Sequence, residues 1–170
     1  MSQPGTVRIV YASSDPESVA LVRSALQPEQ WPLEVVADGD RCVSKFEKGA
    51  PDVVLLDLDL PDIAGLDLLP QITAIDRSVP VIVFAGSGPM EQAVAAMRLG
   101  AVNYMNKPLD AGKVVAAVRN ALQGVWQKRE VERLEAETGR LAKVRIDEVL
   151  SDLAVSGGSD LHIKVGRRPL

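Results

Sequence analysis

Residues 51–69 read PDVVLLDLDLPDIAGLDLL, and this stretch decides the fold. It opens with a short apolar run that ends at Asp57, and Asp59 follows two residues later. A nearly continuous apolar run of this length predicts a strand with helices packed on both faces of its sheet. Pro61 and Gly65 then predict a turn, after which leucine and isoleucine recur at helical spacing.

The same alternation of strand and helix patterns extends in both directions along the chain. Five short runs are rich in valine, isoleucine or leucine and are bounded by turn residues or prolines: Val7–Ala12, Leu33–Ala37, Val53–Leu56, Val79–Phe84 and Val102–Met105. The segments between them show helical spacing and are long enough for crossovers. We therefore predict an α/β fold, a doubly wound parallel sheet with right-handed crossovers and with the first, third and fourth strands in its centre.

In such sheets, ligands bind and reactive residues lie at the carboxyl ends of the central strands. The residues that follow the predicted strands are therefore the candidates for a site. They are Ser13, Ser14 and Asp15 after the first strand, Asp57 and Asp59 after the third, Ala85 after the fourth and Lys107 after the fifth. A carboxylate beside a lysine at such an edge favours chemistry that handles a charged group.

Two motifs carry a family resemblance. The stretch 51–69 resembles the phosphoacceptor strand and loop of response-regulator receiver domains, and GAVNYMNKP at 100–108 resembles the last-strand signature of that family. The resemblance covers roughly Thr6 to Gln123 and implies a flavodoxin-like sheet of order 2-1-3-4-5. It also implies that Asp57 is the phosphoacceptor, Lys107 the phosphate-contacting lysine and Tyr104 the switch aromatic.

Three positions depart from the family pattern. Its metal-binding acidic pair corresponds to Ser13 and Ser14, which carry no formal charge, and its phosphate-binding hydroxyl corresponds to Ala85. Because a divalent cation and a hydroxyl each help to stabilise the transferred phosphoryl group, their loss predicts a much slower reaction. We therefore expect no metal and no other cofactor, with magnesium only if the site works after all. Asp57 and Lys107 are expected to remain as a bare ion pair.

Asp15 and Asp59 are the remaining acids near this edge. Asp15 precedes Pro16 and is predicted to cap the first helix, whereas Asp59 is predicted to place a negative charge where a phosphate would bind. Either residue is also an alternative metal ligand. With Ala85 in the hydroxyl position, any movement of Tyr104 would be steric.

Composition excludes several classes of function. The formal net charge is -4, the pI is near 5.1, and hydrophobic residues make up 46% of the chain. This balance argues against a nucleic-acid partner, and no apolar run is long enough for membrane insertion. Cys42 is the single cysteine and is expected to be a packed thiol, which fits a cytoplasmic location.

The last third of the chain predicts a different organisation. We expect a receiver-like domain at residues 1–123, a helical linker at 124–145 and the truncated start of a second domain at 146–170. The linker carries Val131, Leu134, Leu141 and Val144 on one side, which favours either a solvated helix or a short coiled coil. GGSDLHIKVGRRPL at 157–170 resembles the N-terminal domain of pilus-retraction and type II secretion ATPases.

Three functional hypotheses follow. The first is a phosphorylation-independent regulatory and protein-interaction module at the N-terminus of a pilus or secretion motor ATPase. The alternatives are an active phosphoacceptor switch at Asp57 and a scaffold that dimerises through the linker helix. Protein partners are expected, including a second copy, on the linker helix or on the face that carries Met97 and Tyr104. The chain contains no Gly-x-x-x-x-Gly-Lys-Ser/Thr loop, so it is not expected to hydrolyse ATP itself.

Overall fold

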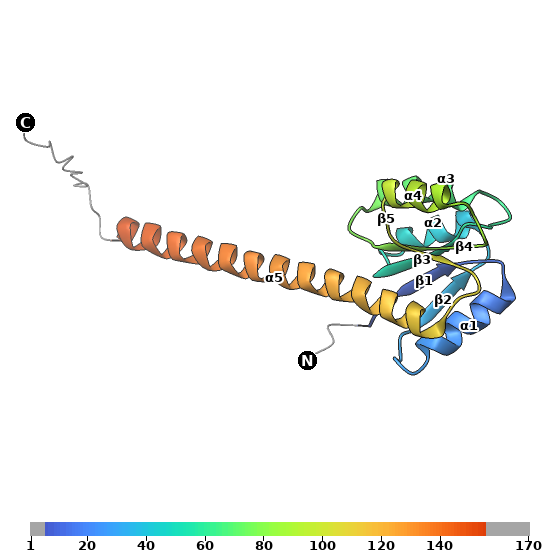
Figure 1. The fold of residues 1–170 in the computed structure, drawn as a ribbon. Helices are drawn as coiled ribbons and strands as arrows, with labels where there is room; N and C mark the ends of the chain where they lie inside the picture. Colours follow the sequence, from blue (N-terminus) through green and yellow to red (C-terminus); the bar gives the residue numbers. More distant parts are fainter. Residues whose placement is uncertain (1–5, 156–170) are drawn as a thin grey trace, which may run out of the picture. The chain divides into compact units, whose positions relative to one another are not determined.

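The computed structural model describes residues 6–155, apart from the side chains of 152–155. Five parallel strands form one sheet in the order β2-β1-β3-β4-β5 (Figure 1), which confirms the predicted fold class. The strands are β1 Ile9–Ala12, β2 Leu33–Val36, β3 Val53–Asp57, β4 Val81–Ala85 and β5 Ala101–Asn106. The helices are α1 Pro16–Leu26, α2 Gly39–Glu47, α3 Gly65–Ile75, α4 Met90–Arg98 and α5 Ala111–Val155.

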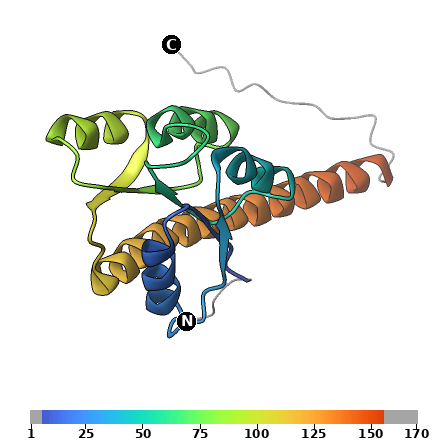
Figure 2. The same ribbon diagram turned by 90° about the vertical axis from the view of Figure 1, so that its right-hand side faces the viewer.

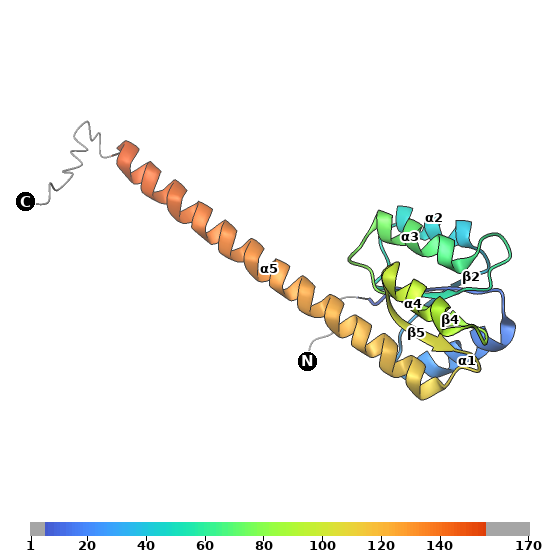
Figure 3. The same cartoon turned by 45° about the horizontal axis from the view of Figure 1, so that its top comes forward.

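Helices cover both faces of the sheet. Helices α2, α3 and α4 lie together on one face, as Figures 2 and 3 show, and α1 and the first part of α5 lie on the other. Every residue of β1, β3 and β4 is buried, because side chains that alternate between the two faces enter one core or the other. The prediction that these three strands are central is therefore confirmed.

The register of the parallel strands brings the candidate residues to one edge. Ala12 of β1 pairs with Leu56 of β3, and Asp57 pairs with Phe84 of β4. The backbone N–H of Lys107 donates to the carbonyl oxygen of Ala85 at 2.7 Å, which fixes the chain after β5 beside the end of β4. Residues that are far apart in the sequence thus meet above Asp57.

Helix α5 extends through the predicted linker, and the predicted domain boundaries stay predictions. It runs without interruption across both predicted boundaries, 123/124 and 145/146, and the first compact unit of the chain ends at Lys128. Gly124 and Gly139 lie within α5 and do not end it, because a glycine weakens a helix but does not break it as a proline would. The segment 157–170, which carries the resemblance to the pilus and secretion ATPases, lies outside the described residues.

The second half of α5 exposes its apolar side chains. Four of them share the stripe that the sequence predicted: Val131, Leu134, Leu141 and Val144. Their exposure fits either a solvated helix or a helix that meets another chain, so dimerisation stays a prediction. Within residues 6–155, no helix combines the length and the apolar composition that crossing a bilayer requires.

Two buried ionisable side chains, Cys42 and Tyr11, should make the stability of the fold depend on pH in the alkaline range. Burial raises the pKa of the Cys42 thiol from 9.0 to about 12, and burial is also the main reason that the pKa of Tyr11 rises from 10.0 to about 12. At intermediate pH the unfolded chain has lost these protons and the native state has kept them. The free energy of unfolding should therefore fall above about pH 9 for Cys42 and above about pH 10 for Tyr11, by on the order of 1 kcal/mol per pH unit for each group.

Urea unfolding followed by tryptophan fluorescence at about pH 8 and about pH 10 measures this fall. A Cys42→Ala variant serves as the control, because it removes the thiol contribution and should show a shallower pH dependence from a lower starting stability. Equal unfolding midpoints for the unmodified chain at both pH values would contradict the assignment.

Candidate phosphoacceptor site

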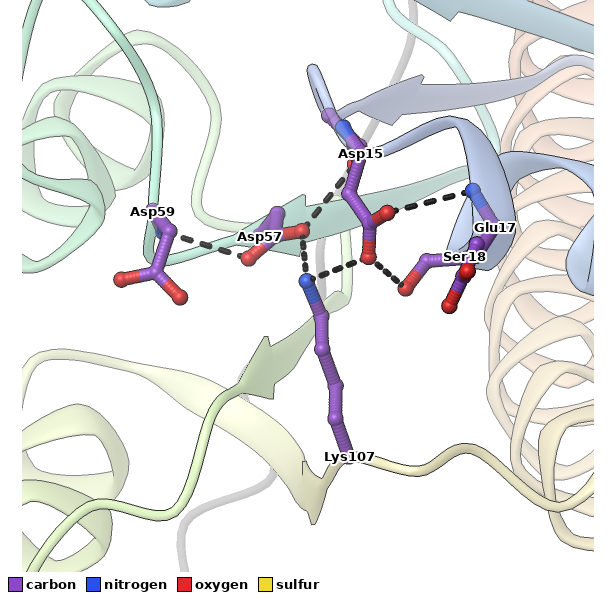
Figure 4. A network of polar contacts seen from close by, with 7 residues as sticks. Asp15, Glu17, Ser18, Asp57, Asp59 and Lys107 are labelled. Atoms are coloured by element: carbon purple, nitrogen blue, oxygen red, sulfur yellow. Dashed lines mark hydrogen bonds and ion pairs between the residues drawn. The ribbon is translucent and has the colours of Figure 1, made fainter.

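Asp57 is the last residue of β3, and its side chain is buried. One carboxylate oxygen, Oδ2, accepts hydrogen bonds from the Ser13 hydroxyl at 3.0 Å and from the Lys107 ammonium at 2.5 Å. The other oxygen, Oδ1, accepts the backbone N–H of Asp59 at 3.2 Å. Figure 4 shows the carboxylate facing Lys107 across the sheet edge. Burying a carboxylate is costly unless hydrogen-bond donors and an opposite charge surround it, and these three donors stabilise the charge of Asp57.

Lys107 bridges two carboxylates. Its ammonium lies 2.5 Å from Asp57 Oδ2 and 3.1 Å from Asp15 Oδ2, and only 18% of its side chain is exposed. Burial opposes protonation, but the hydrogen bonds to Asp57 and Asp15 outweigh it and raise the pKa of Lys107 above its ordinary value of 10.5. The expectation of a bare Asp57–Lys107 pair is therefore wrong, since Asp15 and Ser13 complete a network. The Lys107–Pro108 peptide bond is cis.

Asp15 has two roles at once. It caps α1 as predicted, with Oδ1 accepting the backbone N–H of Glu17 at 3.1 Å, and its other oxygen accepts from Lys107. The Ser18 hydroxyl donates to that same oxygen at 2.5 Å. The hydrogen bonds from Ser18 and then from Lys107 lower the pKa of Asp15 to about 2. Asp15 is thus a negatively charged anchor for Lys107.

The remaining predicted residues surround this network. Ser14 is exposed, and Ala85 is buried at the end of β4, where its methyl group offers no hydrogen bond. Asp59 contributes its backbone N–H to Asp57, and its exposed carboxylate lies beside Gly86, where an added Cβ would be 3.6 Å from Oδ2. Figure 4 shows the Asp59 carboxylate directed away from Lys107. Asp59 therefore does not occupy the space next to the ammonium.

Tyr104 is partly buried on β5, and its hydroxyl donates to Oε1 of Gln92 on α4 at 3.2 Å. Burial, followed by the nearby charge of Asp59, raises its pKa. Met97 of α4, on the face predicted to bind partners, is 49% exposed. The predicted steric movement of Tyr104 is untested, but its hydroxyl already has a polar partner outside the Asp57 network.

Sequence reasoning missed two contributors to the site. Ser18 stands three residues after the capping Asp15, a spacing at which a helical side chain reaches back to its cap, so the sequence contained a signal for it. Gln92 meets Tyr104 through the packing of α4 against β5. No local pattern predicts that contact.

The donor set of this edge does not fit a magnesium ion of the kind that the family resemblance implies. Mg²⁺ binds oxygen ligands in near-octahedral geometry, commonly one or two carboxylates together with phosphate and water. Here Ser13 and Ser14 are neutral, and both Asp15 and Asp57 are already held by Lys107. Within the described part of the chain, no group of three or more histidine, cysteine, aspartate or glutamate side chains is arranged to hold a metal ion.

A buried aspartate at the end of a central parallel strand, paired with a lysine directly after the last strand, is the arrangement of a receiver-type signalling domain. The family model of the response regulator receiver domain matches residues 9–119. The chain therefore belongs to the response regulator receiver domain family.

The chain is similar in sequence to several regulatory proteins. It is 30% identical over 151 residues to the transcriptional regulatory protein TrcR of Mycobacterium tuberculosis, a match that covers 89% of this chain and 58% of TrcR. It is 36% identical over 104 residues to the regulatory protein LuxO of Vibrio vulnificus, covering 61% of this chain and 23% of LuxO. The chain thus spans little more than half the length of the first of these relatives and about a quarter of the second.

Solved structures agree with this assignment. NtrX from Brucella abortus is similar with a TM-score of 0.68 and 30% identity, over 74% of this chain and 29% of that one. The receiver domain of a LuxO repressor protein from Vibrio parahaemolyticus has a TM-score of 0.70 and 25% identity, over 74% and 97% of the two chains.

These relatives correct the first functional hypothesis. A phosphorylation-independent module of a pilus or secretion motor is wrong, because the relatives are transcriptional and other regulatory proteins, and the match to TrcR extends over 89% of the chain. The likeness to the pilus ATPases rested on about twenty-five residues, 146–170. A turn followed by a few alternating apolar residues is common to many proteins, so it carried little information.

Proposed function

We propose that this chain is the receiver module of a response regulator and that Asp57 accepts a phosphoryl group. The observation that carries the proposal is the buried Asp57 carboxylate, held 2.5 Å from the Lys107 ammonium at the carboxyl end of a central strand. A charged pair with one partner buried and the other only 18% exposed costs desolvation free energy, which favours a functional reason for it. The regulatory relatives support the same function.

The residues around Asp57 have distinct tasks in this proposal. The Asp57 carboxylate is the nucleophile, and the Ser13 and Asp59 donors orient it. Lys107 transfers its hydrogen bond from Asp57 to an oxygen of the incoming phosphoryl group and offsets the added negative charge. Phosphorylation therefore breaks the present ion pair, and the change at the end of β5 reaches Tyr104, which lies three residues before Lys107.

The activity and partners of the whole protein follow from the same proposal. Because the relatives are transcriptional and regulatory proteins, we place the chain in a two-component system that controls gene expression. Its phosphodonor partner is a phosphorylated protein of that system, and the chain itself is not an ATPase. A cytoplasmic location is part of the proposal and agrees with the buried free thiol of Cys42.

Incubation with acetyl phosphate and magnesium, followed by intact mass measurement, tests the function. We expect an adduct of one phosphoryl group that hydroxylamine removes, because an acyl phosphate is labile to that nucleophile. Asp57→Asn should abolish the adduct, whereas Asp67→Asn, a change at an exposed carboxylate in the first turn of α3, should leave it unchanged. Failure to detect an adduct on the unmodified chain would overturn the proposal.

A further inference from the structure

The carboxylate of Asp57 is already fully engaged by protein donors. Three of them converge on it, and they come from three different strand ends: the Ser13 hydroxyl after β1, the Asp59 N–H after β3 and the Lys107 ammonium after β5. Two of the three share Oδ2. A divalent cation would have to displace Lys107 or approach without the acidic pair that normally attracts it.

Lys107 already provides a positive charge beside the Asp57 carboxylate. Asp15 holds the ammonium from the side of α1, and Ser18 and the Glu17 N–H fix the Asp15 carboxylate in turn. A hollow of about 330 Å³ opens beside this ammonium and is bordered by Asp15, Ser18, Gly86, Ser87 and Lys107, among others. A phosphodonor can therefore enter next to a fixed positive charge.

We infer that Asp57 accepts its phosphoryl group without a bound divalent cation, and that Lys107, positioned by Asp15, supplies the positive charge instead. The inference rests on the proposed function of Asp57. It deepens that function, because it names the residue that replaces the metal.

The reaction balances without a metal or a proton transfer. An oxygen of the Asp57 carboxylate attacks the phosphorus of an acyl phosphate donor, such as acetyl phosphate, and forms a new P–O bond. The bond between phosphorus and the leaving group breaks, and the leaving group departs with the electron pair. Lys107 stays protonated throughout, and Asp15 keeps the ammonium in place as its hydrogen bond moves from Asp57 to the phosphoryl oxygen.

The test compares the rate of adduct formation from acetyl phosphate in excess magnesium with the rate in EDTA, followed by intact mass. We expect equal rates in the two conditions. An adduct that forms only with magnesium would overturn the inference and leave the proposed function standing. No adduct in either condition would instead overturn the proposed function, so the two failures are distinguishable.

A second experiment tests whether the reaction can be made to depend on magnesium. In the double variant Ser13→Asp/Ser14→Asp, two new carboxylates should slow the reaction in EDTA, and magnesium should restore it. Ser24→Asp adds the same kind of charge at an exposed position of α1 and should leave the rate independent of magnesium. A double variant whose rate does not respond to magnesium would contradict the inference.

The positioning role of Asp15 has its own readout. Asp15→Asn removes one of the two carboxylates that hold the ammonium, so the alkaline limb of the pH–rate profile should move to lower pH, and Asp15→Glu should restore it in part. The groups that face Lys107 from the packed elements are Asp57, Asp15 and Tyr11. An Asp15→Asn profile that overlays that of the unmodified chain would remove Asp15 from the scheme.

Discussion

Lys107→Met is expected to lower the free energy of unfolding by about 3 kcal/mol at neutral pH, because the buried Asp57 carboxylate loses its only ionic partner within the network described above. The ammonium and the carboxylate lie 2.5 Å apart, and their side chains are 18% and 1% exposed. Water therefore cannot replace the lost interaction. Urea unfolding followed by tryptophan fluorescence measures the change.

A double-mutant cycle separates the ion pair from the packing of the lysine side chain. In an Asp57→Asn background the same Lys107→Met change should cost less, by about 1–3 kcal/mol, because no buried charge is left unpaired. The matched control is Lys45→Met, which removes an ammonium that pairs with Glu34 at the surface and should cost less than about 1 kcal/mol. Equal costs of Lys107→Met in the two backgrounds would show that the pair does not stabilise the fold.

The fold was largely predictable from the sequence because each strand carries its own signal. The apolar run 53–56 has no polar face, and only a strand covered on both sides explains it. Turn residues flank most of the other strands in the sequence, so the predicted ends of the five strands lie within two residues of the observed ends. The continuation of α5 through residues 111–144 was predictable as well, because Gly124 and Gly139 weaken a helix by only about 1 kcal/mol each and no proline ends it.

The sequence predicted which residues form the site, but it did not predict which of them contact one another. The rule that chemistry lies at the carboxyl ends of parallel strands identified Asp57, Lys107 and Asp15. Only the structure shows that Lys107 bridges both acids, because the rotamer of a long flexible side chain is set by neighbours distant in the sequence. Neutral residues at the metal-ligand positions predict a lost reaction, whereas the structure shows Lys107 held by two carboxylates beside the Asp57 side chain.

Gly65→Ala is expected to destabilise the protein by about 2 kcal/mol, through a steric clash with the backbone at the end of β3. A Cβ at this position would lie 2.6 Å from the Cα of Leu58 and 2.8 Å from the carbonyl oxygen of Asp57. Both are backbone atoms, so no side-chain rotation relieves the contact. The strand end must move instead, which should also slow phosphoryl acceptance by Asp57 because the nucleophile is displaced.

The opposite result is expected for the same substitution at Gly124. This glycine lies within α5, it is exposed, and nothing stands within 4 Å of an added Cβ. Gly124→Ala should therefore stabilise the chain by about 0.5–1 kcal/mol, since alanine loses less backbone entropy in a helix than glycine does. Urea midpoints that shift in the same direction for the two variants would contradict this account. Opposite shifts would show that the close approach of α3 to the acceptor strand, and not helix propensity, requires glycine at position 65.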